Sequence, residues 1–155
     1  RDRSPSRGLG DVYKRQNAVT VFNRFYEPDI DIENMKIGSA SVFSTPVDLR
    51  TTLRWTGILA GKDQLLEISA SSGVHQGDAV VKLLLAGATT VQVCTAMYEQ
   101  GVGCIDTMNH FLNSWMNKKG FKSIDEFRGK LSYADVQHAE RYERAQFMKY
   151  FSDKK

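Results

Sequence analysis

The chain has 155 residues, 41% of them hydrophobic and 25% charged, which is enough to bury the core of a single domain. No apolar run reaches the roughly 18 residues that a membrane-spanning helix needs, and no stretch near the start is typical of a secretory signal. The formal net charge of +3 arises in the first 16 residues, which hold five basic and two acidic side chains, so the neutral remainder argues against a nucleic-acid-binding surface.

Residues 1–16 differ in composition from everything that follows. They are rich in Arg, Ser and Gly and have no hydrophobic periodicity, so the sequence predicts disorder there. A basic interaction arm is one interpretation. The stronger one is that DVYKRQ, at residues 11–16, is the translation of a sequencing-library adaptor and is not native. We therefore set residues 1–16 apart from the fold and expect the native protein to extend further towards its N-terminus.

Residues 17–25 predict a buried strand that ends in a polar pair, Asn23 and Arg24. Such a pair is either a ligand contact at the carboxyl end of a barrel strand or a strand end that meets solvent. Residues 26–35 are acidic but lack the Gly and Glu positions of a calcium-binding loop, so a solvated loop is expected. Residues 36–44 alternate weakly, which is compatible with a short irregular strand or a hairpin.

A helix is predicted to begin at Ser44-Thr45-Pro46, because a hydroxyl cap followed by proline is typical of a first turn. It runs to about residue 60, and its basic face, with Arg50 and Arg54, is expected to be solvated. Residues 65–70 then predict a second buried strand.

Two turns of small residues follow two consecutive strands, and they are the most informative feature of the sequence. Ser71-Ser72-Gly73 follows the strand at 65–70, and a helix over 77–85 leads to a β-branched strand at 90–93, which ends in Cys94-Thr95-Ala96. This is a βαβ unit with a parallel sheet, so the fold class is α/β. Small residues let backbone N–H groups approach an anion, and a helix N-terminus adds positive potential. A phosphate site is one interpretation, and tight βα turns without a ligand are the other.

The C-terminal third is predicted to be helical. A short helix reaches residue 99, an amphipathic helix spans 104–119, Ser123 and Glu126 form a capping box, and a long charged helix starts at 132. Cys94 and Cys104 are too few for a disulfide framework and lack metal-ligand spacing, which favours a reducing cytoplasm and no metal.

Four segments together resemble the C-terminal part of dihydroorotate dehydrogenase, of the soluble class and its bacterial dihydroorotate dehydrogenase-like branch. They are VTVFNRFYEPDID, STPVDLRTTLRW, SSGVHQGDAVVKLLLAGATTVQVCTAMYEQG and WMNKKGFKSIDEFRGKL, within residues 17–131. The resemblance implies about three βα units of a (β/α)8 TIM barrel over 17–131, followed by a C-terminal helix over 132–155.

The resemblance also implies FMN as cofactor. Its phosphate would be bound by the two small-residue turns, at Ser71, Ser72, Gly73, Cys94 and Thr95. Many members of the family have Gly-Gly in place of Ser72-Gly73 and Gly in place of Cys94. Asn23 matches the asparagine that hydrogen-bonds the orotate ring, and Arg24 stands where the family usually has Ser, so both are expected to bind substrate.

The implied activity is the FMN-dependent oxidation of dihydroorotate to orotate in pyrimidine biosynthesis, by a cytoplasmic homodimer. The family's catalytic base, a Cys or Ser, and its flavin-contacting Lys lie on earlier segments that this sequence lacks. No catalytic residue is therefore assigned, Cys94 and Cys104 included, and the chain alone is expected to be inactive and poorly soluble. The alternatives are another phosphate-binding barrel enzyme, such as a pyrimidine-reducing flavoenzyme or an isomerase, and a non-functional truncated fragment.

Overall fold

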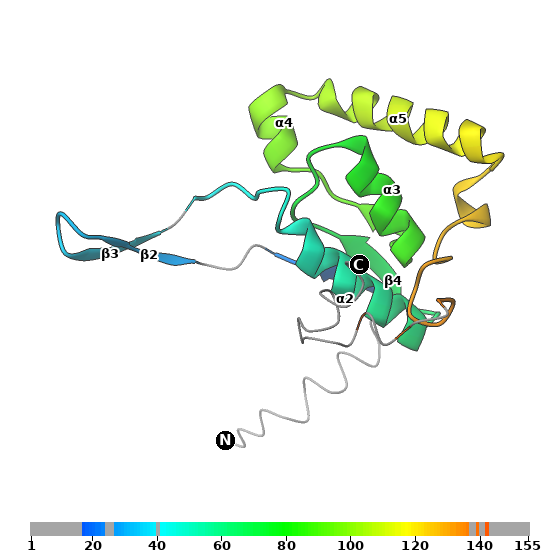
Figure 1. Cartoon of the computed structure of the whole chain (residues 1–155), viewed down its shortest axis with the longest axis horizontal. Coiled ribbons are helices and arrows are strands. Elements are labelled where there is room, and N and C mark those ends of the chain that lie inside the picture. The colour runs from blue at the N-terminus through cyan, green and yellow to red at the C-terminus, as the bar shows by residue number, and fades with distance from the viewer. Residues whose placement is uncertain (1–16, 24–26, 40, 137–138, 140–141, 143–155) are drawn as a thin grey trace, which may run out of the picture.

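The computed structural model describes residues 17–23, 27–39, 41–136, 139 and 142. Their centre is a parallel sheet of β1 (Ala18–Val21), β4 (Glu67–Ala70) and β5 (Thr90–Val91), in the order β1-β4-β5. Helix α2 (Leu49–Lys62) precedes β4, and α3 (Gly77–Ala86) connects β4 to β5. The α/β class and the parallel sheet are as predicted, with α2 and α3 packed beside β4 (Figure 1). Because the strands are parallel, all three end on the same side of the sheet.

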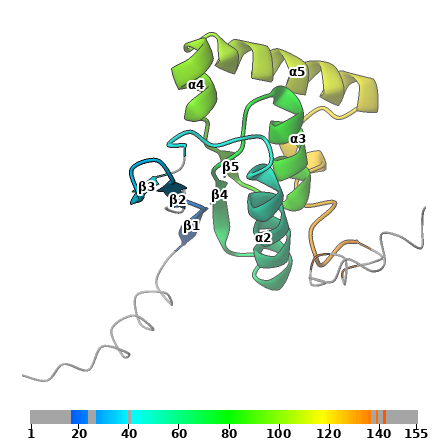
Figure 2. The ribbon, with the colours of Figure 1, turned by 60° about the vertical axis from the view of Figure 1, so that its left-hand side comes forward.

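The two faces of this sheet differ in burial. Ile68 and Ala70 are fully buried and Val21 nearly so, on the face that α2 and α3 cover side by side (Figure 2). The alternate positions of the same strands are polar or small and largely exposed, as Thr20 and Glu67 show. In the part of the chain that the structure describes, the sheet is therefore one layer with helices on one face, and β1 and β5 are its outer strands.

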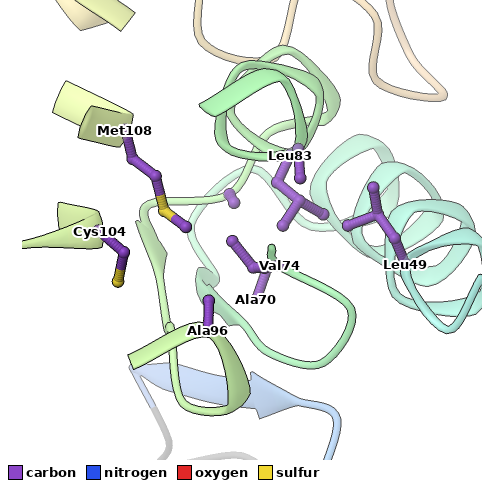
Figure 3. Close-up of a cluster of buried hydrophobic side chains, with 9 residues drawn as sticks. Leu49, Ala70, Val74, Leu83, Ala96, Cys104 and Met108 are labelled. Carbon is purple, nitrogen blue, oxygen red and sulfur yellow. The ribbon is translucent and has the colours of Figure 1, made fainter. Parts of the chain in front are cut away.

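The main core lies between this sheet and the helices, and small side chains let the layers approach closely. Figure 3 shows Leu49 of α2 and Leu83 of α3 converging above Ala70, with Met108 of α5 closing the other side. Helix α5 spans Cys104–Lys119, the range predicted from its apolar spacing, and follows the short helix α4 (Thr95–Gln100). The packing of the helices against the sheet therefore holds the turns at the strand ends in place.

A second core, rich in aromatic side chains, joins the C-terminal segment to α3 and α5. Phe127 is fully buried, with its ring centroid 5.1 Å from that of Trp115 and 5.3 Å from that of Phe121. The preceding 3-10 helix η1 (Ile124–Glu126) is short, as expected. The predicted capping box is wrong, because Ser123 makes no side-chain cap and Glu126 instead accepts from the backbone N–H of Lys122.

Residues 26–35 were expected to be a loop, but residues 28–39 form a protruding antiparallel hairpin of β2 (Pro28–Asp31) and β3 (Lys36–Ser39) (Figure 1). Ile30 pairs with Ile37 across the hairpin, and Asp31 pairs with Lys36. The carboxylate of Asp31 accepts from the side chain and backbone of Asn34 and from the backbone of Glu33, which closes the turn and lowers the pKa of Asp31 below its ordinary 3.8. The acidic side chains thus act as turn-forming acceptors, a role that the prediction of a solvated loop missed.

The predicted start of α2 is close to the observed one. The Asp48 carboxylate accepts from the Thr45 backbone N–H at 2.6 Å and from the Thr45 hydroxyl at 3.2 Å. The Asp48 backbone N–H donates to the Thr45 carbonyl, and a turn over residues 46–48 leads into the helix. Arg54 is not freely solvated as expected, because its Nε donates to the backbone oxygen of Tyr142 at 2.6 Å. The C-terminal segment is therefore attached to α2.

The final helix does not begin at Ser132. Residues 131–135 form turns instead, because their backbone N–H groups bond outwards: Leu131 donates to Leu85 of α3 and Tyr133 donates to Gly57 of α2. The Ser132 hydroxyl donates to Asp135. Most of the expected helix, 137–155, and the segment 1–16 lie outside the described residues, apart from residues 139 and 142.

Candidate functional site

The carboxyl ends of β1, β4 and β5 are held in register by hydrogen bonds that continue beyond the strands. The backbone N–H of Ser71 donates to Val21 at 2.6 Å, and that of Gln92 donates to Ala70 at 2.8 Å. The turns after the three strands consequently meet around one cavity of about 150 Å³. Its lining residues are Asn23, Val42, Ser44, Ser71, Ser72, Gly73, Val74, Gln92, Cys94 and Thr95.

Six of the seven residues singled out from the sequence line this cavity. They are Asn23 after β1, Ser71, Ser72 and Gly73 after β4, and Cys94 and Thr95 after β5. The seventh, Arg24, lies outside the described residues. The structure thus brings together two turns that are separate in the sequence, and it adds the end of a third strand to them.

The turn after β4 has a backbone that only small residues accept. Gly73 has φ +76, and a Cβ added there would overlap the backbone of Leu49. Ser72 also has a positive φ, of 80, which glycine adopts without cost but a serine does not. These two residues let the chain turn sharply, so that the backbone of the turn borders the cavity.

Sequence reasoning missed one residue that ties the site together, Ser44. Its backbone N–H donates to Thr95 Oγ1 at 3.1 Å, and its own hydroxyl shares a hydrogen bond of 2.9 Å with the same atom. The sequence indicated Ser44 only as part of a helix start, since the contact spans 51 residues. Val42, Val74 and Gln92 were missed as well, because none of them belongs to a pattern that points to a ligand.

Polar and apolar groups contribute about equally to the cavity lining, and none of the described residues that line it has a charged side chain. Its polar groups are hydroxyls, two side-chain amides and a thiol, and the small residues of the turns let the backbone come close to a bound group. These neutral donors suit an anion. A volume of about 150 Å³ equals that of roughly five water molecules. A neighbouring hollow of about 100 Å³ shares Asn23 and Ser72 but is also lined by Glu27 and Asp48, whose carboxylates disfavour an anion there.

The two cysteines lie in different environments. Cys94 is exposed at the cavity, whereas Cys104 is buried at the start of α5, and both are free thiols. Over the described ranges, no three or more His, Cys, Asp or Glu side chains gather as metal ligands. Within that same part of the chain, none of the helices has the length and apolar character that crossing a bilayer takes.

Comparisons with known proteins agree with the resemblance seen in the sequence. The chain is 40% identical over 67 residues to dihydroorotate dehydrogenase (fumarate) of Lachancea kluyveri, which covers 43% of this chain and 21% of that protein. It is 37% identical over 70 residues to a probable dihydroorotate dehydrogenase A (fumarate) of Streptococcus pneumoniae, covering 45% and 22% of the two chains. The resemblance to dihydroorotate dehydrogenase is confirmed.

The match is partial, since this chain spans about a fifth of the length of these curated relatives. No protein-family model matches it. Among solved structures, two crystal structures of DHODH from Eimeria tenella are similar in fold. The complex with ferulenol has a TM-score of 0.59 at 18% identity over 76% of this chain and 32% of the other, and the ligand-free form has 0.54 at 21% identity over 61% and 25%.

Proposed function

We propose that this chain is the cofactor-phosphate-binding, C-terminal part of an FMN-dependent dihydroorotate dehydrogenase that oxidises dihydroorotate to orotate in pyrimidine biosynthesis. In this proposal β1, β4 and β5 are three strands of a (β/α)8 barrel whose other strands would continue from the free edges of the sheet. The exposed, polar face of the sheet would then face the barrel interior. The one-sided helical cover of the sheet supports this arrangement.

The observation that carries the proposal is the shared cavity. Ser71, Ser72 and Gly73 from one turn and Cys94 and Thr95 from the next line one small space without a carboxylate. A flavin phosphate fits this chemistry, since neutral hydroxyls and close backbone would bind its oxygens. The curated relatives are named dihydroorotate dehydrogenase, which is the family that the ordered motifs of this sequence resemble.

In the proposed reaction, the site residues of this chain bind the cofactor and the substrate but carry out no chemical step. The two turns would bind and orient the phosphate, and Asn23, which lines the same cavity, would hold the substrate ring. Arg24, beside it in sequence, would contact the substrate as well. Bound FMN would supply the hydride acceptor. The base would come from the part of the protein outside this chain, as would most of the barrel, so the chain alone is inactive in this proposal.

The first test measures binding of FMN and of riboflavin, which lacks the phosphate, by fluorescence titration of the chain. The expected result is binding of FMN that is at least tenfold tighter than that of riboflavin, roughly the contribution of charge-assisted hydrogen bonds to a phosphate. Cys94→Asp places a negative charge in the cavity at an exposed position and should abolish the preference, whereas Cys94→Ser should retain it. Equal binding of both flavins by the chain would contradict the proposal.

The second test uses the longer parent protein, obtained by extending the gene upstream of residue 17. A visible flavin spectrum that bleaches on addition of dihydroorotate is expected, and the bleached flavin should be reoxidised by fumarate, the compound in the names of the curated relatives. Flavin that does not bleach would move the substrate elsewhere, with Arg24 the first residue to exchange. Size-exclusion chromatography of the same sample tests the proposed homodimer, and cell fractionation tests the proposed cytoplasmic location.

A further inference from the structure

A line of polar side chains leads from the surface of α4 to the cavity. The Glu99 carboxylate lies 3.9 Å from His75 Nδ1, and His75 Nε2 lies 3.5 Å from the Ser44 hydroxyl oxygen. That hydroxyl in turn shares the 2.9 Å hydrogen bond with Thr95 Oγ1, which lines the cavity. Glu99, His75, Ser44 and Thr95 thus form a continuous chain of polar contacts that ends at the cavity.

The middle of this chain is shielded from water. The His75 side chain is 12% exposed, and Thr95 is 7% exposed. Glu99, at the outer end, is 47% exposed. Since both ring nitrogens of His75 face a partner, the protonation of this ring decides which way the hydroxyl protons of Ser44 and Thr95 point.

In the neutral ring, the two hydroxyls point away from the cavity. The Glu99 carboxylate can only accept, so it favours the tautomer with the proton on Nδ1, and Nε2 is then an acceptor. The Ser44 hydroxyl then donates a hydrogen bond to Nε2, and the Thr95 hydroxyl donates one to the Ser44 oxygen. Thr95 then has no proton left for a ligand in the cavity.

In the protonated ring, the direction of these bonds reverses. Nε2–H donates to the Ser44 oxygen, so that oxygen accepts from His75 in place of the Thr95 hydroxyl. Thr95 Oγ1 continues to accept from the Ser44 backbone N–H, and its hydroxyl proton is free to point into the cavity. The cavity gains one donor together with a nearby positive charge, and both favour an anion.

We propose that His75 is a positioning residue of the anion site, which through Ser44 turns the Thr95 hydroxyl towards a bound phosphate when the imidazole is protonated. This inference rests on the proposed function, because it names the control of the same site. Among the described residues, the charged group that faces His75 is Glu99 of α4, while the loop before α2 contributes the uncharged Ser44. Anion binding by the chain therefore strengthens as the pH falls from about 8 to about 5.5, the range in which histidine changes charge.

The test uses sulfate, a phosphate mimic that stays doubly charged throughout this range, so that any pH dependence belongs to the protein. Sulfate affinity of the chain is measured at about pH 5.5 and about pH 8 by isothermal titration calorimetry. The expected result is affinity about tenfold higher at the lower pH, the effect of a hydrogen bond to a charged group. His75→Gln should remove the pH dependence and leave the weaker affinity at both values.

A matched control and a second variant separate this inference from general effects of pH. His110→Gln removes an exposed histidine on α5 and should keep the tenfold difference. Ser44→Ala interrupts the chain of contacts but keeps the His75 ring and its charge, so it should reduce the pH dependence to clearly less than tenfold without removing it. Circular dichroism at both pH values verifies that each variant is folded.

The outcomes distinguish the inference from the proposed function. If His75→Gln keeps the wild-type pH profile, or if the wild-type profile is flat while FMN still binds more tightly than riboflavin, the inference is wrong and the phosphate site stands. If the folded chain binds neither sulfate nor FMN at either pH, both the phosphate site and the role of His75 are refuted.

Discussion

Gly73 lies directly against the backbone of Leu49, so the turn after β4 rests on the first residue of α2. A Cβ at position 73 would overlap the Leu49 nitrogen, and the residue also has φ +76. We expect Gly73→Ala to lower the free energy of unfolding by more than about 2 kcal/mol, since it adds a clash with backbone to the cost of the left-handed conformation. Urea unfolding measures this loss.

Gly120 offers a control for the conformational part of this effect. It has nearly the same φ, +77, in the left-handed conformation at the end of α5, but a Cβ there would meet nothing within 4 Å. Gly120→Ala should therefore cost only about 1 kcal/mol, the effect of the positive φ alone. Equal losses at the two positions would show that the contact with Leu49 is unimportant.

Ser72→Gly is expected to stabilise the protein slightly. Serine at φ 80 is strained by about 1 kcal/mol, and glycine relieves this strain while adding some freedom to the unfolded chain. The long 3.4 Å hydrogen bond from the Ser72 hydroxyl to Phe22 is a small loss. The net gain should be about 0.5 kcal/mol in urea unfolding, whereas Ser69→Gly in the middle of β4 should be destabilising.

Phe127→Ala should be among the most destabilising substitutions. The ring is fully buried and contacts both Trp115 and Phe121, so its removal leaves a cavity in the aromatic core and costs about 3–5 kcal/mol. Phe111→Ala is the matched control, because that ring is 45% exposed, and it should cost clearly less. Loss of cooperativity in the tryptophan fluorescence transition would accompany the first change only.

Stability should fall at alkaline pH partly because of Tyr142. Burial raises the pKa of its hydroxyl above the ordinary 10.0, so above this value the unfolded chain releases a proton that the folded chain retains. The stabilising contribution is therefore complete below pH 10.0 and is lost as the pH rises through the higher pKa of the folded state. Tyr142→Phe should reduce the slope of unfolding free energy against pH in this range, and an unchanged slope would contradict the assignment.

Much of the fold could be predicted because hydrophobic spacing and local turn signals agree. Helix α5 was predicted at its observed bounds, and Gly87 and Gly120 end their helices in the left-handed conformation that this position favours. Strand β3 lies in the segment 36–44 that was expected to hold a short strand or a hairpin, but its partner β2 was missed, because the apolar pair of the hairpin, Ile30 and Ile37, is exposed at 68% and 77%. A strand without a buried face makes few packing contacts, so little in its sequence distinguishes it from a loop.

The candidate site could be predicted only where it is local. Ser71, Ser72 and Gly73 are consecutive and follow a recognisable strand, so their position at the cavity followed from the βαβ pattern. Ser44 and His75 reach Thr95 through contacts that depend on how the loop before α2 folds onto α4. The sequence indicates hydroxyl and imidazole groups there, but tertiary packing determines which of them meet.

The strand order β1-β4-β5 has a consequence for how the chain folds. The pairing of β4 with β5 joins residues 21 positions apart, as from Ser69 to Thr90, whereas the pairing of β4 with β1 joins residues 49 positions apart, as from Ala70 to Val21. Shorter loops close at a smaller entropic cost and sooner. We therefore expect β4, α3 and β5 to form the folding nucleus, with β1 and Asn23 joining last. The two turns that would bind the phosphate then exist before the residue that would hold the substrate, and an anion already present would stabilise the nucleus while β1 joins the sheet.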